Sequence, residues 1–354
     1  MNIVSSLSHF SRLPPTDSKC AQINILAMQK PFHLLKLPSI AIEEVLKQID
    51  RVELIDLAQC SKRSAHFVRL EALHRYKLTL DFGIKHVELG KFKIYAWNLP
   101  PGRDALIQMK TFGSCTVPCR VETMLMETYW RDRKQGLETL VLFLARLFRM
   151  KISQFFSDSQ DLARFHSVMK FLLEWQKDIE RLNINVEITE ENLSRIMTEL
   201  KITGELWISS QLAINSSFQF PNYPSMLRLD SSSWFTLDHL LAAQDCVRIA
   251  LVESSLTNKD LDVFVGKWKT GEYPKLECLD VTGDRLDGQT MIVGLAPPIV
   301  NIHNQKQETK LLGTYYAARI TNAVDIHRDT DKIRASLHMD STKKPIRFQM
   351  IAWI

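Results

Sequence analysis

Glycine is scarce in this sequence, and so are the motifs that known catalytic sites use. The chain has 12 glycines among 354 residues, so it offers few places for the glycine-rich loops that cradle phosphate groups. It contains no HExxH, no GxxxxGKS or GxxxxGKT and no GxSxG. The 10 histidines are dispersed, and isolated ones such as His166 and His239 are more typical of surface or satisfied core positions. We therefore expect no catalytic residues, no cofactor and a protein that is not an enzyme.

Long apolar runs and a cysteine framework are missing as well. The longest nearly apolar run, 137–150, is interrupted by Arg146 and Arg149 and is shorter than the roughly 18–20 residues that cross a membrane, so it predicts a buried helix. The N-terminus has no charged region followed by a continuous apolar stretch. The cysteines are scattered, which indicates a reduced, intracellular protein; they are Cys20, Cys60, Cys115, Cys119, Cys246 and Cys278.

The spacing of the cysteines disfavours a metal site, and the distribution of charge disfavours nucleic-acid binding. Cys115 and Cys119 form the closest cysteine pair, but a structural zinc site needs a second pair of ligands at similar spacing, which the sequence lacks. The 45 basic and 40 acidic residues leave a net charge of +5, spread along the chain and not gathered into the basic stripe of a nucleic-acid-binding protein. We expect free thiols, no metal and no nucleic-acid partner.

The composition that remains is that of a folded, multidomain protein. Hydrophobic residues make up 45% of the chain, as in ordinary globular proteins, and its length suits two or three domains. Residues 1–29 show no periodicity and are expected to form a disordered leader. Regular patterns begin after this segment.

Residues 31–68 contain three short helical patterns in close succession. Pro38 suits the first turn of a helix, because its missing N–H would have no partner there. An apolar stripe with helical spacing follows, and two further patterns come after it. The stripe is Ile42, Val45, Leu46 and Ile49, and the later patterns are Leu54, Leu57 and Ala58, then Ala65, Val68 and Ala72. The sequence predicts three short helices stacked at angles.

This stretch resembles the F-box family. The resemblance is carried by Leu37-Pro38, Ile42, Val45-Leu46, Leu54, Leu57 and Cys60-Ser61-Lys62. The sequence departs from the family's pattern at Cys60, where valine is usual, and in its third helix, where Phe67 is the nearest aromatic residue instead of the common tryptophan. The resemblance implies a three-helix unit that docks on a Skp-type adaptor and through it joins a cullin and a RING subunit. The residues implied to contact the adaptor are Leu35, Leu37, Pro38, Ile42, Val45, Leu46, Ile49, Leu54, Leu57 and Cys60.

From about residue 120 the sequence alternates between extended and helical patterns. The extended ones are 120–130, 185–190, 204–210, 226–232, 246–254 and 276–283, and the helical ones are 136–148, 191–200, 236–244 and 257–268. From residue 185 the strands recur about every 20–30 residues, the span of one leucine-rich-repeat unit. Tryptophans near element ends are expected in the core; they are Trp130, Trp207, Trp234 and Trp268. We predict an α/β fold in which a degenerate, leucine-rich-repeat-like domain follows the three helices.

Residues 254–281 have a second recognisable pattern. Thr257 or Asn258 is expected to cap a helix, Asp260 lies in its first turn, and Gly271 is expected to end it. The stretch resembles the type-2 F-box-associated domain of the large nematode F-box family. In that family two strands close the domain, and 329–340 and 345–353 match them.

These patterns divide the chain into the leader, an F-box at 30–75, a connecting region at 76–119 and an F-box-associated, repeat-like domain at 120–354. The two resemblances imply a substrate-recognition subunit of an SCF-type ubiquitin ligase, which tethers an unknown target protein for ubiquitination. No membrane partner is expected.

Alternatives remain open at this point. Arg131, Arg133 and Lys134 of the segment RDRK are candidates for binding an acidic or phosphorylated target, or they form a solvated loop. The competing function is a repeat-type scaffold with no ligase role, in which the N-terminal helices merely cap the repeats. A small hydrolase within 185–285, built from residues that the fold brings together, is a third possibility.

Overall fold

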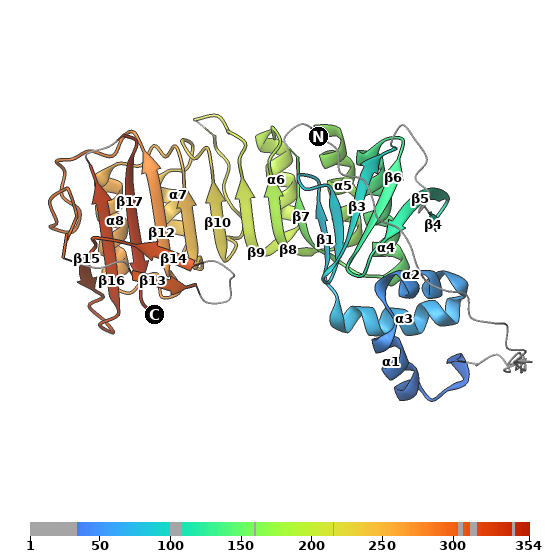
Figure 1. Ribbon diagram of the computed structural model, residues 1–354. Coiled ribbons are helices and arrows are strands. Elements are labelled where there is room, and N and C mark those ends of the chain that lie inside the picture. Colours follow the sequence, from blue (N-terminus) through green and yellow to red (C-terminus); the bar gives the residue numbers. More distant parts are fainter. Residues whose placement is uncertain are drawn as a thin grey trace, which may run out of the picture.

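The structure is a computed structural model that describes residues 34–99, 108–158, 161–214, 216–303, 307–311, 317–341 and 344–354. The leader expected at 1–29 lies outside these residues. One long sheet runs through the molecule, helices α4 to α8 lie on one of its faces, and α1 to α3 lie below one end of it (Figure 1). The fold is the predicted mixed α/β type.

Three helices form the N-terminal unit, after a short 3-10 turn. Helix α1 begins directly after Pro38, as the sequence predicts. Asp50 caps α2, since its carboxylate accepts hydrogen bonds from the backbone N–H groups of Val52 (2.8 Å) and Glu53 (2.9 Å). The bounds are η1 (Leu34–Lys36), α1 (Ser39–Gln48), α2 (Arg51–Cys60) and α3 (Lys62–Arg75).

Fifteen strands in the described residues form the long sheet, in the order β15-β16-β17-β12-β11-β10-β9-β8-β7-β1-β2-β3-β6-β5-β4. The strands from the N-terminal half are β1 (Leu78–Asp81), β2 (His86–Leu89), β3 (Phe92–Asn98), β4 (Gln108–Phe112), β5 (Cys115–Val121), β6 (Leu125–Trp130), β7 (Ile152–Phe156) and β8 (Asp178–Ile184). The later ones are β9 (Lys201–Ile208), β10 (Met226–Leu229), β11 (Arg248–Leu251), β12 (Cys278–Gly283), β15 (Val324–His327), β16 (Arg334–Asp340) and β17 (Ile346–Ala352).

The middle of the sheet is a solenoid. Strands β7 to β12 are neighbours in sequence and in space, all parallel, and they begin at residues 152, 178, 201, 226, 248 and 278. Each chain segment between them returns across the same face, as in leucine-rich repeats. The helices on this face are α4 (Arg133–Phe148), α5 (Leu162–Trp175), α6 (Glu190–Glu199), α7 (Leu237–Ala242) and α8 (Asn258–Lys269). The predicted repeat architecture is therefore confirmed.

Antiparallel strands extend the solenoid at both ends. Strand β1 pairs with β7 in parallel, and β2 and β3 continue the sheet as an antiparallel meander towards β6, β5 and β4. At the other end β17 pairs with β12, and β16 pairs with β17, so the predicted closing pair of strands is present. The stretch 76–119, which the sequence analysis treats as a connecting region, supplies β1 to β4 and the first residues of β5. This corrects that interpretation, because the segment is part of the sheet.

Two extended predictions are displaced. A strand is expected at 185–190, but the strand in this region is β8, which ends at Ile184. Val186 and Ile188 are apolar because they are buried in the loop that follows β8, and not because they belong to a strand. The run 120–130 is interrupted at 122–124, which separates β5 from β6. Strand β7 and helix α5 were not predicted.

Different elements pack on the two faces of the sheet. The helical face holds the main hydrophobic core, which continues without a break into the three N-terminal helices. On the opposite face a hairpin packs Ala318 and Ile320 against Cys278 of β12 and Ile351 of β17. The hairpin consists of β13 (Gln307–Lys310) and β14 (Ala317–Ile320). Burial raises the pKa of the Cys278 thiol to about 12.

Candidate functional site

The residues expected to contact an adaptor separate into buried and accessible groups. Ile42, Leu46 and Leu54 are 0%, 1% and 2% exposed, so they form the internal core of the three helices. They are not available to a partner in this arrangement, which corrects their assignment as contact residues. The apolar periodicity of the sequence indicates the face that packs against the other helices, and not a face that contacts a partner.

The accessible group lies mostly on and around α1. Pro38 and Cys60 are exposed, and the half-buried members are Leu35, Leu37, Val45, Ile49 and Leu57. Sequence analysis missed Ile40, whose side chain is 77% exposed in the first turn of α1. Its signal in the sequence is an isoleucine that lies outside the buried stripe of the helix, two residues after Pro38. Helix α1 is the part of the N-terminal unit farthest from the sheet (Figure 1).

The three-helix unit is joined firmly to the sheet domain. The Nε group of Arg69 in α3 donates a hydrogen bond to the carbonyl oxygen of Leu147 near the end of α4 (2.6 Å). Lys110 of β4 forms an ion pair with Asp56 of α2. Because the buried cores of the two parts are also continuous, the unit is held in one orientation relative to the sheet.

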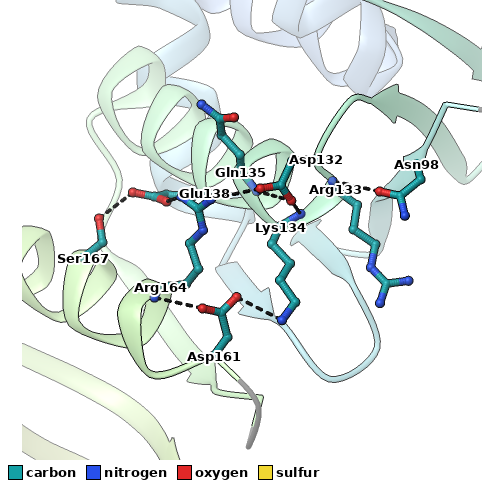
Figure 2. Close-up of polar contacts among 9 residues, drawn as sticks. All are labelled: Asn98, Asp132, Arg133, Lys134, Gln135, Glu138, Asp161, Arg164 and Ser167. Carbon is teal, nitrogen blue, oxygen red and sulfur yellow. Dashed lines mark hydrogen bonds and ion pairs between the residues drawn. The ribbon is translucent and has the colours of Figure 1, made fainter.

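The basic segment RDRK forms the start of α4. Asp132 caps the helix, accepting hydrogen bonds from the backbone N–H groups of Lys134 (2.9 Å) and Gln135 (3.4 Å). Lys134 pairs with Asp161 at 3.1 Å (Figure 2), so this candidate is engaged within the chain. Figure 2 shows the guanidinium of Arg133 turned away from the cluster. Neither Arg131 nor Arg133 forms an ion pair with any residue that the structure describes.

Arg164 of α5 links this segment to the rest of α4. Its guanidinium donates to Glu138 (2.9 Å) and to Asp132 (3.0 Å), as Figure 2 shows. Burial alone would raise the pKa of Asp132, but the two capping N–H groups and Arg164 outweigh it and lower that pKa. The cluster is thus a structural brace between α4 and α5, and Arg131 and Arg133 are its free basic groups.

The sheet face opposite the helices has a preorganised polar centre on β9 and β10. The guanidinium of Arg228 lies 4.2 Å from the centre of the Trp207 ring. Asp230 accepts hydrogen bonds from the indole N–H of Trp207 (2.6 Å) and from Nε of Arg228 (2.8 Å). Trp207 is half-buried here, whereas the other three tryptophans expected in the core are at most 6% exposed. Tryptophan and arginine are the residue types that dominate binding surfaces.

A second group of aromatic side chains lies on the same face of β2 and β3. Tyr95 and Trp97 stack with ring centres 5.8 Å apart, and His86 lies 5.3 Å from Tyr95. His86 is 4% exposed, and within the described ranges neither its Nδ1 nor the indole N–H of Trp97 has a hydrogen-bond partner. Burial lowers the pKa of His86, assisted by Lys93 and opposed by Asp81 and Glu88.

Two known families match parts of the chain. The F-box domain family matches residues 34–76, which include η1 and α1 to α3. A second family, described as F-box associated, matches residues 216–281, which include β10 to β12 with α7 and α8. The chain therefore contains one segment similar to F-box domains and one similar to F-box-associated domains. F-box proteins of this kind are generally non-catalytic adaptors.

Similar proteins are found in Caenorhabditis elegans. An uncharacterized protein is 25% identical over 270 residues, covering 71% of this chain and 61% of its own length. The Skn-1 dependent zygotic transcript 15 protein is 25% identical over 182 residues, covering 48% of this chain and 52% of its own length. The chain therefore spans about half to three fifths of the length of these relatives. No solved structure matches it.

None of the helices in the described ranges combines the length and apolar composition of a membrane span. In the same part of the chain, no group of three or more His, Cys, Asp or Glu side chains is arranged to hold a metal ion.

Proposed function

We propose that this protein is the substrate-recognition subunit of an SCF-type ubiquitin ligase. The F-box binds a Skp-type adaptor and through it a cullin and a RING subunit, and the sheet domain binds a target protein. The protein performs no bond chemistry itself, since tethering raises the effective concentration of the target's lysines at the ligase. The function is intracellular.

The observation that carries this proposal is the order of the two domains along one chain. An F-box at 34–76 precedes a domain whose sheet presents preorganised tryptophan and arginine side chains to solvent. F-box domains generally bind Skp-type adaptors, and F-box-associated domains generally bind substrates. A scaffold without a ligase role is the competing hypothesis.

The adaptor surface that we propose is the accessible group around α1. It consists of Leu35, Leu37, Pro38, Val45, Ile49, Leu57 and Cys60, to which we add Ile40. Burying a side chain of this size is worth roughly 1.5–3 kcal/mol, so the loss of Ile40 alone weakens binding about tenfold or more. Ile42, Leu46 and Leu54 contribute indirectly, by holding the helices together.

The test is co-purification of the full chain with a Skp-type adaptor. Ile40→Asp should reduce the recovered adaptor at least about tenfold without changing the melting temperature measured by circular dichroism. Ile302→Asp is the matched control, because Ile302 has the same 77% exposure but lies in the C-terminal part of the chain. Leu46→Ala should instead lower the free energy of unfolding. Failure of the wild-type chain to bind the adaptor would favour the scaffold hypothesis.

A further inference from the structure

Two cavities lie next to each other at the sheet edge where the parallel strands end. The first, of about 610 Å³, is lined by the loops that follow β8 and β9. The second, of about 470 Å³, is lined by the loops that follow β10, β11 and β12. Ile214 lines both, so we call the two cavities together the rim groove. Their volumes are those of ordinary ligand pockets. These loops run along the upper edge of the sheet in Figure 1. The three N-terminal helices lie below the opposite edge.

Large apolar side chains are exposed along the rim groove. Leu162, Ile214 and Val252 are 45%, 66% and 37% exposed; Leu162 is the first residue of α5, and the other two come from different loops. Ile214 lies where the two cavities meet. Apolar side chains that gather on a surface beside cavities are typical of protein interaction sites.

The charged side chains that line the rim groove are mainly acidic. Glu187 lines the first cavity, and Glu253 and Asp284 line the second. All three are exposed, and none forms an ion pair with a residue that the structure describes. Arg285 is the basic residue among those lining the cavities. The groove is therefore suited to a positively charged partner.

The same polarity extends along the parallel strands. Acidic residues end or follow β1, β7, β8, β10, β11 and β12, at Asp81, Asp158, Glu187, Asp230, Glu253 and Asp284. Basic residues precede or begin β1, β7, β8, β9, β11 and β12, at Lys77, Lys151, Lys177, Lys201, Arg248 and Lys275. At the opposite edge the charges of Lys77, Lys151 and Lys275 are offset by ion pairs with Glu180, Asp178 and Asp245. Since parallel strands place their carboxyl ends on one edge, the acidic residues gather at the rim groove and attract a basic segment there.

We propose that the rim groove binds an extended segment of the target protein that combines apolar side chains with lysine or arginine. The inference rests on the proposed role as a target receptor. From β8 to β12 there are four strand spacings, about 19 Å, which about six extended residues cover. Apolar side chains of the segment enter the cavities on either side of Ile214. Its basic side chains reach Glu187, Glu253 and Asp284.

The test is selection of binders from a displayed library of random twelve-residue peptides, with the immobilised full chain as bait. Peptides rich in both apolar and basic residues should be enriched, and the best of them should bind more weakly as salt concentration rises. Ile214→Asp should reduce the affinity of the chain for the best selected peptide at least about tenfold, measured by fluorescence anisotropy. Met109→Asp on β4 is the matched control, because Met109 is 61% exposed but lies at the far end of the sheet.

Charge reversal provides a second variant that keeps the fold intact. Glu253→Lys combined with Asp284→Lys should shift the selected peptides from lysine and arginine towards aspartate and glutamate. The proposal is overturned if the wild-type chain enriches no basic and apolar peptides, or if both Ile214→Asp and the charge reversal leave binding unchanged. Adaptor binding is measured on the same preparations. Peptide selection without adaptor binding supports the rim groove and removes the ligase role, whereas adaptor binding without selection overturns the rim groove alone.

Discussion

At the scale of single residues, burial decides which side chains are available for binding. Leu46 and Ile40 are both apolar residues of α1, yet Leu46 is 1% exposed and Ile40 is 77% exposed. The first therefore stabilises the F-box, and the second is free to contact a partner. Trp207 makes the same point on the sheet, since it is half-buried against Arg228 whereas Trp234 and Trp268 are fully enclosed.

His86 should make stability depend on pH in the weakly acidic range. Burial lowers its pKa in the folded state below the value of about 6.5 that it has when unfolded. As pH falls below about 6.5, the unfolded chain therefore takes up a proton that the folded chain does not, and the free energy of unfolding decreases. Chemical denaturation at pH 7 and pH 5 should show this decrease in the wild-type chain and a smaller one in His86→Gln.

The control for this comparison is His166→Gln, because His166 is an exposed residue of α5. It should lose as much stability between the two pH values as the wild-type chain does. An equal decrease in His86→Gln and the wild-type chain would contradict the role assigned to His86.

At the scale of elements, the repeats are maintained even where a helix is missing. Between β9 and β10 the described residues contain no helix, and an aromatic cluster occupies the helical face instead. Phe218 packs against Phe220 and Trp234, with ring centres 4.8 Å and 5.8 Å apart. His239 fixes this loop, as its Nε2 lies 2.7 Å from the carbonyl oxygen of Phe218. Aromatic side chains thus replace the volume of a helix.

Two helical glycines should respond in opposite ways to a methyl group. Gly136 in α4 lies directly against the Trp130 ring, so Gly136→Ala creates an overlap and should destabilise the protein by about 1–3 kcal/mol. Gly266 in α8 has no atom near the position of an added methyl group, so Gly266→Ala should stabilise it by about 0.5–1 kcal/mol. Urea denaturation of both variants measures the two effects. Changes of the same sign would contradict the close packing of α4 on Trp130.

The solenoid elements were predictable because their signals are local. Thr257 caps α8 with Asp260 as expected, and Gly271 follows the helix with a φ of +98°. The meander β1 to β3 was not predictable, since its strands are short and β1 finds its parallel partner only at β7, more than 70 residues later. Helical periodicity likewise identified the apolar face of α1, but it could not show that α2 and α3 cover that face. The rim groove has no linear motif, because it is assembled from the loops after five strands together with Leu162 of α5 and Pro345.

At the scale of the whole molecule, the F-box and the sheet domain act as one body. Their hydrophobic core is continuous, and polar contacts add to it at α3 and α2. Under the proposed role, a target held on the sheet domain would be presented to the ligase in a defined position. The fixed orientation of the two parts depends on the contacts between α3 and α4. A substitution that removes one of these contacts should therefore loosen the connection.

Arg69→Ala should loosen this joint selectively. The substitution leaves the carbonyl oxygen of Leu147 without its charged donor, a loss of roughly 1.5–3 kcal/mol. Hydrogen exchange followed by mass spectrometry should show faster exchange in α2 and α3 and unchanged exchange in β9 to β12. Arg195→Ala is the control, because Arg195 pairs with Glu199 on the exposed surface of α6. Equal acceleration in both regions would show that the joint is not a separate element of stability.

The late position of α4 in the chain has a consequence for biosynthesis. The F-box helices leave the ribosome first, but the helix that completes their packing ends at Phe148, more than 70 residues after α3 begins. At roughly 5–20 residues per second, the nascent F-box waits several seconds for that surface. During this interval the side chains of α2 and α3 that later pack against α4 are exposed to chaperones, while the proposed adaptor surface around α1 does not depend on α4. An adaptor that binds the nascent chain would thus serve as its first folding partner.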